Sequence, residues 1–241
     1  MRSLFRKIRE ANRPFCTALV AAAGSSSRMG GTDKLMEFLD NVPVLMRTLT
    51  ALQRAAAIDE IVIAAREDAL VDISTLCKTY GITKCSKVVR GGESRCHSVL
   101  LAALEASPEA KLLAVQDGAR PLVTPALIDR TVEAAAKCGA AAPAVPVKDT
   151  IKRAKDGIIQ ETVDRSTLFA VQTPQVFQAD FISAALYDCI QKGVAITDDC
   201  SAAEHLGKQV TLVEGEDANI KLTTPTDLAI GEALLRWQTR I

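Results

Sequence analysis

Short apolar runs alternate along the chain with longer segments whose apolar residues recur at helical spacing. The short runs have the length and composition of buried strands, and the longer segments predict helices between them. The expected strands are residues 16–23, 60–65, 87–90, 111–116 and 140–147. The expected helices are residues 44–56, 68–80, 93–106 and 125–137. This alternation predicts a Rossmann-like α/β fold, in which a mostly parallel sheet carries helices on both faces.

The regular alternation stops at residues 148–172, where two polar, strand-like pieces flank a turn signal. The pieces are residues 150–152 and 158–163, and the turn signal is Lys155-Asp156-Gly157. We expect this segment to form a protruding β-hairpin arm. Beyond it, the pattern predicts a helix at 179–191, a shorter helix after Thr197, a strand at 209–214 and a closing helix at 225–237.

The length of the chain sets the expected number of domains. With 241 residues, 48% of them hydrophobic, the chain can bury one sizeable core. We therefore expect a single domain over residues 15–241, with the arm at about 148–172. The basic residues 1–14 are expected to form an N-terminal extension, either an exposed helix or a frayed end.

Charge and cysteine content narrow the expected partners. Lysine plus arginine and aspartate plus glutamate both total 29, so no global bias favours nucleic acid or an anionic membrane. No apolar run is long enough to cross a bilayer, and no signal-peptide pattern starts the chain. The seven cysteines include no close pair of the kind that binds zinc. We expect a cytoplasmic protein whose cysteines are reduced. Because its total charge is balanced, any anion must be bound by a local group of residues.

A loop rich in small residues follows the first predicted strand. Residues 21–34 read A-A-A-G-S-S-S-R-M-G-G-T-D-K, at the edge where open α/β sheets bind ligands. Small residues let backbone N–H groups approach phosphate oxygens, and Arg28 and Lys34 add two positive charges. The loop lacks the G-K-[ST] ending of the Walker motif and the G-x-G-x-x-G spacing of dinucleotide-binding folds. A flexible surface loop is the simpler alternative. Its position and its two cations favour a polyphosphate site.

Two further segments follow predicted strands. Residues 91–99, G-G-E-S-R-C-H-S-V, open a helix, and taken alone they read as an ordinary strand-to-helix turn. Asp117 ends the fourth strand, beside the first loop. A carboxylate there could hold Mg²⁺ against a triphosphate, since Mg²⁺ usually takes one or two carboxylates plus phosphate oxygens. The structural alternative is a turn that precedes Arg120.

These segments, together with four later blocks, resemble one family. The first loop matches A-A-G-x-x-x-R-M-G-x-x-x-K of sugar-nucleotide cytidylyltransferases, although Asp33 stands where that wider group commonly has proline. The later blocks are V-K-D-T-I-K at 147–152, T-V-D-R-S-T-L at 162–168 and Q-T-P-Q-V-F at 172–177. A closing block, N-I-K-L-T-T-P-T-D-L, occupies 219–228. The chain after Phe15 resembles the 2-C-methyl-D-erythritol 4-phosphate cytidylyltransferases, which transfer CMP from CTP and release pyrophosphate.

The resemblance implies a nucleotide half of the site. Arg28 and Lys34 would stabilise charge on the α-phosphorus and the departing pyrophosphate. Asp117 would hold Mg²⁺ or another divalent cation. The residues implied to bind nucleotide are Ala22, Ala23, Gly24, Ser26, Gly91, Gly92, Glu93, Ser98, Asp117, Gly118 and Arg120.

The resemblance also implies an acceptor half that is shared between two subunits. Arg165 on the arm would reach the site of a partner subunit in a homodimer, and with Lys221 it would position the acceptor phosphate. Thr150 and Thr173 would line the acceptor site, and Asp217 would bind acceptor hydroxyls. Without the resemblance, Arg165 reads as an edge-strand arginine that keeps the hairpin soluble.

Two other functions remain open at this stage. A ribitol 5-phosphate cytidylyltransferase shares the nucleotide motifs and differs in what its arm recognises. A catalytically silent protein that senses CTP would keep the fold but would need no second site to bind an acceptor phosphate. The presence of cations in both halves, Arg28 with Lys34 and Arg165 with Lys221, favours an enzyme.

Overall fold

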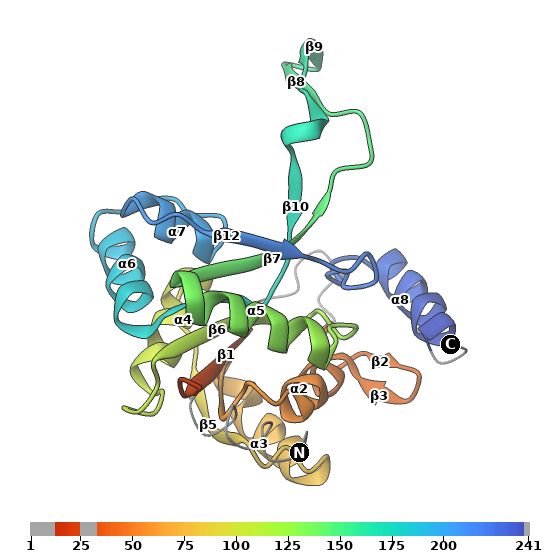
Figure 1. Ribbon diagram of the computed structural model, residues 1–241. Helices are drawn as coiled ribbons and strands as arrows, with labels where there is room; N and C mark the ends of the chain where they lie inside the picture. Colours follow the sequence, from red (N-terminus) through yellow and green to blue (C-terminus); the bar gives the residue numbers. More distant parts are fainter. Residues whose placement is uncertain (1–12, 25–32, 239–241) are drawn as a thin grey trace, which may run out of the picture.

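The computed structural model describes residues 13–24 and 33–238 (Figure 1). Its first half alternates strands and helices close to the predicted positions. These elements are β1 Cys16–Ala22, β2 Phe38–Leu39, β3 Val42–Pro43, α2 Val44–Arg54, β4 Glu60–Ala65, α3 Leu70–Thr79, β5 Cys85–Arg90, α4 Arg95–Leu104, β6 Leu112–Asp117, α5 Pro125–Cys138 and β7 Ala140–Pro146. A 3₁₀ turn, η2 Glu67–Ala69, precedes α3. The short β2–β3 hairpin is not among the predicted elements.

The second half contains the arm and the closing elements. They are β8 Lys152–Lys155, β9 Ile158–Thr162, the 3₁₀ turn η3 Arg165–Thr167, β10 Phe169–Val171, β11 Gln175–Gln178, α6 Ala179–Gln191, α7 Asp199–His205, β12 Thr211–Glu214 and α8 Pro225–Gln238. Helix α6 matches its predicted bounds, and α7, β12 and α8 lie within two residues of theirs. None of the described helices is long and apolar enough to span a bilayer.

The central sheet has the strand order β10-β7-β11-β6-β1-β4-β5, with β12 also paired to β7. Pairs β1–β4, β1–β6, β4–β5 and β12–β7 are parallel, which confirms the predicted α/β class. Strand β11 is antiparallel to both β6 and β7, and β10 is antiparallel to β7. Neither β10 nor β11 is predicted, so the parallel register is interrupted at one end of the sheet.

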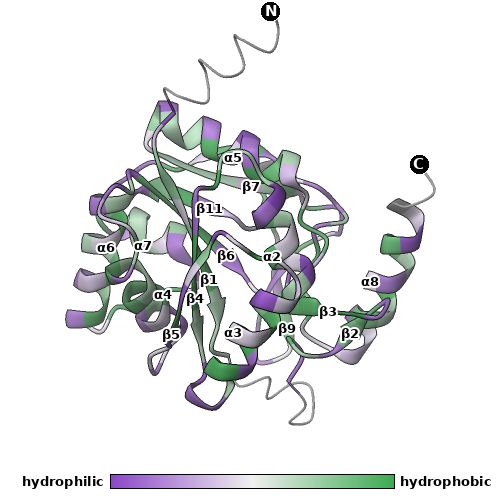
Figure 2. Ribbon diagram, turned by 90° about the horizontal axis from the view of Figure 1, so that it is seen from below, coloured by the Kyte–Doolittle hydropathy of each residue, from purple (hydrophilic) through white to green (hydrophobic). Residues whose placement is uncertain are grey.

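Helices cover both faces of this sheet. Alternate residues of β1 face opposite sides, so Cys16, Ala18 and Val20 pack in one apolar cluster and Leu19 in the other. The first cluster includes residues of α2, α3 and α5, and the second those of α4, α6 and α7. Figure 2 shows the apolar strands between these two helical layers. The two faces explain why the strands read as continuous apolar runs.

The arm stands clear of the sheet (Figure 1). Strands β8 and β9 form an antiparallel hairpin, and Asp156 and Gly157 turn it with φ angles of 51° and 78°. This confirms the predicted hairpin. Strand β10 pairs with β7 at the base, so the projecting part is shorter than the predicted 148–172.

The predicted N-terminal extension lies mostly outside the described residues. Residues 1–12 belong to that part of the chain. Arg13, the first described residue, makes two hydrogen bonds of 2.6 Å to the Asp59 carboxylate. The chain is therefore attached to the body of the fold from Arg13 onward.

Candidate active site

A pocket of about 330 Å³ opens at the carboxyl ends of β1 and β6. The chain runs from β1 to β4 on one side of β1 and returns to β6 on the other. Open α/β sheets bind ligands where the strand order reverses in this way, because the loops that leave the two strands diverge there. The described lining residues are Ala21, Ala23, Gly24, Lys34, Leu35, Gly92, Glu93, Ser94, Arg95, Ser98, Asp117, Gly118, Ala119 and Lys221.

The first loop contributes Gly24 and Lys34 to the pocket. Ser26 and Arg28 lie outside the described residues. Asp33 anchors the segment that carries Lys34: its Oδ1 accepts a hydrogen bond from the Leu35 N–H at 3.1 Å, and its Oδ2 lies 3.1 Å from Arg66 Nη2. An aspartate at this position is therefore used locally to fix the turn that places Lys34 at the pocket.

The glycine pair after β5 packs closely behind the pocket. A Cβ on Gly91 would lie 2.4 Å from the Ala23 Cβ and 2.9 Å from the Ser98 Oγ, so only glycine fits there. The Ser98 hydroxyl accepts a hydrogen bond from the Gly92 N–H at 3.0 Å and donates to the Ser94 carbonyl at 2.8 Å. Ser98 thus holds the glycine turn in place while it lines the pocket.

Asp117 is the electrostatic centre of the pocket. Its side chain is 9% exposed, and its carboxylate lies 2.9 Å from Lys221 Nζ, 3.4 Å from Arg95 Nε and 3.5 Å from Arg120 Nε. Burial by itself would raise the pKa of Asp117, but the Arg95, Lys221 and Arg120 charges outweigh burial and lower it to about 2. Asp117 is therefore ionised at any physiological pH, among more positive charge than it can neutralise alone.

Arg95 and Asp199 belong to this site, although the sequence reading assigned no role to either. Arg95 Nη2 donates a 2.7 Å hydrogen bond to the fully buried Asp199 carboxylate, while its Nε faces Asp117. Burial raises the pKa of Asp199. Gln175 Oε1 accepts hydrogen bonds from the Asp199 and Cys200 N–H groups at 2.9 and 3.0 Å. Asp199 therefore fixes Arg95 from behind, at the N-terminus of α7.

Residues 197–202, T-D-D-C-S-A, have the sequence pattern of a helix cap and packing element. Asp198 does cap α7, because its side chain accepts from the Ser201 N–H at 3.0 Å. The neighbouring Asp199 points the other way, to Arg95. The arginine of the G-G-x-x-R segment could have indicated this contact with Asp199, because a charged side chain inside a fold needs a partner of opposite charge.

Several predicted site residues lie behind the pocket and do not line it. Thr173 Oγ1 accepts a 3.2 Å hydrogen bond from the Asp117 N–H, and Arg120 Nη1 donates at 2.6 Å to the carbonyl of buried Asn219. Asn219 in turn donates to the Thr173 carbonyl at 3.0 Å. These contacts hold the backbone at Asp117. Ala22 and Gly91 are likewise packing positions next to the pocket.

The predicted acceptor residues separate into two groups. Lys221 lines the pocket and pairs with Asp117. Thr150, Arg165 and Asp217 do not line the pocket of their own chain. Arg165 lies in η3 on the arm, where its guanidinium donates to the Lys148 carbonyl, and Asp217 pairs with Lys148 at 2.6 Å. Among the described residues, a single chain thus gathers Lys34, Asp117 and Lys221 at the pocket and leaves Thr150, Arg165 and Asp217 apart from it.

The suitability of the pocket for a divalent cation depends on Asp117. Among residues 13–24 and 33–238, no group of three potential metal ligands occurs. Mg²⁺ is commonly held by one or two carboxylates plus substrate phosphates, so a single ionised aspartate beside a polyphosphate site is a fitting donor set. The low pKa of Asp117 keeps that carboxylate ionised, and Lys221, Arg95 and Arg120 already contact it.

A small-residue loop and a pocket lined by Lys34, Arg95 and Lys221, at the switch point of a mostly parallel sheet, define the class of Rossmann-like nucleotidyltransferases. A family model described as 2-C-methyl-D-erythritol 4-phosphate cytidylyltransferase matches residues 16–237. The chain belongs to that family.

Individual relatives agree with this assignment. The Bacillus cytotoxicus 2-C-methyl-D-erythritol 4-phosphate cytidylyltransferase is 42% identical over 225 residues, covering 93% of this chain and 99% of the relative. The Dehalococcoides mccartyi protein of the same name is 41% identical over 220 residues, covering 91% and 95%. The solved 4-diphosphocytidyl-2C-methyl-D-erythritol synthase from Anaerococcus prevotii has a TM-score of 0.83 at 28% identity, and covers 95% of this chain and 99% of its own.

Proposed function

We propose that this chain transfers CMP from CTP to 2-C-methyl-D-erythritol 4-phosphate. The products are 4-diphosphocytidyl-2-C-methyl-D-erythritol and pyrophosphate, and the reaction belongs to the non-mevalonate route to isoprenoids. The observation that carries the proposal is the cluster of Lys34, Arg95 and Lys221 around Asp117, in a chain that belongs to this family along residues 16–237.

The nucleotide half would bind CTP and stabilise the transfer. Backbone N–H groups near Ala23 and Gly24, which line the pocket, would approach phosphate oxygens, and Lys34, with Arg28, would stabilise charge on the α-phosphorus and the pyrophosphate. The Gly92 to Ser98 turn would recognise cytosine. Mg²⁺ held by Asp117 would neutralise part of the triphosphate charge. These roles follow from the family motifs and, for the described residues, from their positions at the pocket.

The acceptor half would be completed by a second subunit. Lys221 from one chain and Arg165 from the partner's arm would hold the acceptor phosphate so that its oxygen faces the α-phosphorus. No general base is needed, because a phosphate dianion is already a nucleophile. Thr150, Thr173 and Asp217 would complete this half.

The surface of the arm supports a homodimer. Ile158 and Ile159 are 68% and 61% exposed, and Phe169 at the base is 45% exposed. A two-stranded hairpin with apolar side chains in water is marginal on its own, so a second copy that covers it would stabilise it. We place the enzyme in the cytosol, because all seven cysteines are unpaired.

The acceptor is tested by comparing turnover with each candidate substrate separately. Purified protein receives CTP, Mg²⁺ and either 2-C-methyl-D-erythritol 4-phosphate or ribitol 5-phosphate, and pyrophosphate release is followed. We expect kcat/KM to be roughly tenfold or more higher with the methylerythritol phosphate, because the site must distinguish a methyl branch and hydroxyl positions. Faster turnover with ribitol 5-phosphate would reject the proposed acceptor. Binding of CTP without pyrophosphate release from either acceptor would instead favour a nucleotide sensor.

A further inference from the structure

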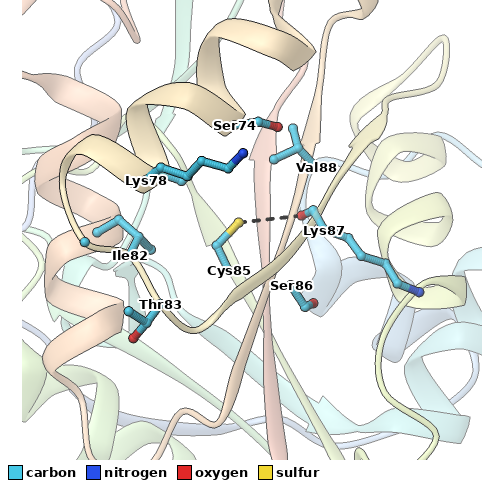
Figure 3. A pocket seen from close by; sticks show the side chains of 10 residues that line it. Ser74, Lys78, Ile82, Thr83, Cys85, Ser86, Lys87 and Val88 are labelled. Atoms are coloured by element: carbon cyan, nitrogen blue, oxygen red, sulfur yellow. Dashed lines mark hydrogen bonds between the residues drawn. The ribbon is translucent and has the colours of Figure 1, made fainter.

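A second pocket of about 420 Å³ lies between α3 and β5, and none of the predicted site residues lines it. Its lining includes Cys77 and Lys78 from α3 and Cys85 and Lys87 from β5 (Figure 3). Strand β5 is the edge strand of the sheet, so the pocket opens at the periphery of the fold. The chemistry it presents is that of two thiols.

The loop between α3 and β5 brings the two cysteines together. The Ile82 N–H donates to the Cys77 carbonyl at 2.8 Å, and the Cys85 N–H donates to the Ile82 carbonyl at 3.2 Å. The chain therefore folds back tightly on itself, and the start of β5 lies against the last turn of α3. Across this junction, the Cys77 and Cys85 side chains line the same pocket.

The two thiols differ in exposure. Cys77 is 5% exposed and packs in the apolar cluster, whereas Cys85 is partly exposed. Figure 3 shows the Cys85 sulfur in the pocket, where it approaches the Lys87 carbonyl at 3.8 Å. A small molecule that enters the pocket therefore reaches Cys85 first, with Cys77 directly behind it.

The two thiols also differ in reactivity. Interaction with the neighbouring Cys77 thiol lowers the pKa of Cys85, and the same interaction together with burial raises the pKa of Cys77. The thiolate is the reactive form of cysteine, so Cys85 is the nucleophile of the pair. Elsewhere burial raises the pKa of the cysteines at 16, 96, 189 and 200.

We propose that Cys77 and Cys85 form an oxidisable dithiol, a modification site that closes to an intramolecular disulfide with a low-molecular-weight disulfide as oxidant. The Cys85 thiolate attacks one sulfur of the oxidant, and the other sulfur leaves as a thiolate. Cys77 then loses its proton and attacks the Cys85 sulfur, which expels the second half of the oxidant. The two protein thiols are oxidised to one disulfide, and one oxidant disulfide is reduced to two thiols.

The test uses the full chain, reduced and then incubated with glutathione disulfide. Trypsin separates the two cysteines, because Arg66, Lys78, Lys84 and Lys87 are cleavage points. We expect mass spectrometry to find peptide 67–78 joined to peptide 85–87, with the loss of two hydrogens. Thiol reductant should reverse the link. A persistent glutathione adduct on Cys85, with no cross-link, would overturn the proposal.

Single substitutions test the order of the two steps. Cys77→Ser should trap glutathione on Cys85, and Cys85→Ser should leave Cys77 largely unmodified. Cys138, the exposed last residue of α5, is the internal reference for an ordinary surface thiol. If Cys85 in the Cys77→Ser variant is modified no faster than Cys138, the assignment of Cys85 as the nucleophile is contradicted. The cross-link in the unsubstituted protein remains decisive if either variant fails to fold.

Discussion

The pocket and the arm are built in opposite ways. At the pocket, Asp117 is nearly buried, meets three cations, and has its backbone held by Thr173. On the arm, every residue of β8 and β9 is exposed, and Ile158 and Ile159 lack a core of their own. The charged groups of the pocket have partners within a single chain, whereas the apolar side chains of the arm are left exposed. Under the proposed function, the nucleotide half would form within one chain, whereas the acceptor half would depend on assembly.

The largest expected effect is on the pocket side of this comparison. Lys34→Ala should lower kcat by roughly 10²–10³-fold, the usual cost of removing one donor that stabilises transition-state charge. Steady-state kinetics with pyrophosphate detection measure the change. The fold should persist, because Lys34 contributes to the pocket wall and not to the apolar core.

Lys137→Ala is the matched control for Lys34. Lys137 lies on the exposed face of α5, away from the pocket, and its loss should leave kcat unchanged within twofold. Equal activity of the Lys34→Ala variant and the control would remove Lys34 from the mechanism and with it the electrostatic reading of the pocket.

The buried charge cluster also predicts a pH dependence of stability. The pKa of Asp117 is lowered to about 2 in the folded chain, below its value of about 3.9 in unfolded peptides. A lowered pKa stabilises the fold above the unfolded value, and this contribution is lost as pH falls from about 4 toward 2. Asp117→Asn should remove about 2 kcal/mol of acid-dependent stability, seen as a flatter dependence of the free energy of unfolding on pH.

Urea unfolding between pH 6 and pH 2 measures this difference. Asp217→Asn is the exposed counterpart, since Asp217 pairs with Lys148 at the surface, and it should change the free energy of unfolding by at most about 0.5 kcal/mol. Parallel pH curves for the unsubstituted protein and Asp117→Asn would show that the three cations do not act on Asp117 as the geometry indicates.

The fold was largely predictable because both of its periodicities are strong. Strand β4 and helix α6 match their predicted bounds, and the Lys155-Asp156-Gly157 signal correctly indicated the hairpin. Strand β11 was missed because its four residues, Q-V-F-Q, contain only two adjacent apolar residues, too short a run to indicate a strand. Its antiparallel pairing with β6 and β7 is a tertiary contact that local pattern does not contain.

The site was predictable where it follows strand ends, and not where charges meet across the fold. Gly24, Gly92 and Asp117 each follow or end a strand, so the carboxyl edge of the sheet gathers them. Arg95 and Asp199 lie 104 positions apart, and only the packing of α4 against α6 and α7 joins them. Spacing along the chain carries no information about such a pair.

The arm side of the comparison is tested by Arg165→Ala. If Arg165 serves a partner's site, this change should lower kcat/KM for the acceptor by roughly ten- to hundredfold, the loss of a charged hydrogen bond, and leave CTP binding unchanged. Mixing Arg165→Ala with Lys34→Ala subunits should then restore roughly a quarter of normal activity, because half of the dimers combine one intact site with one defective site. No recovery after verified subunit exchange would place Arg165 in its own chain's chemistry.

The smallest effect is expected for an exposed ion pair on the arm, which tests whether residues other than Arg165 matter there. Arg153 on β8 pairs with Glu161 on β9, and both side chains are more than half exposed. Arg153→Ala should change the free energy of unfolding by less than about 0.5 kcal/mol, because water screens such a pair and ordering two long side chains offsets its attraction. Turnover should also remain within twofold of the unsubstituted protein. A loss of activity as large as that of Arg165→Ala would mean that the whole cationic face of the hairpin, and not one arginine, meets the partner.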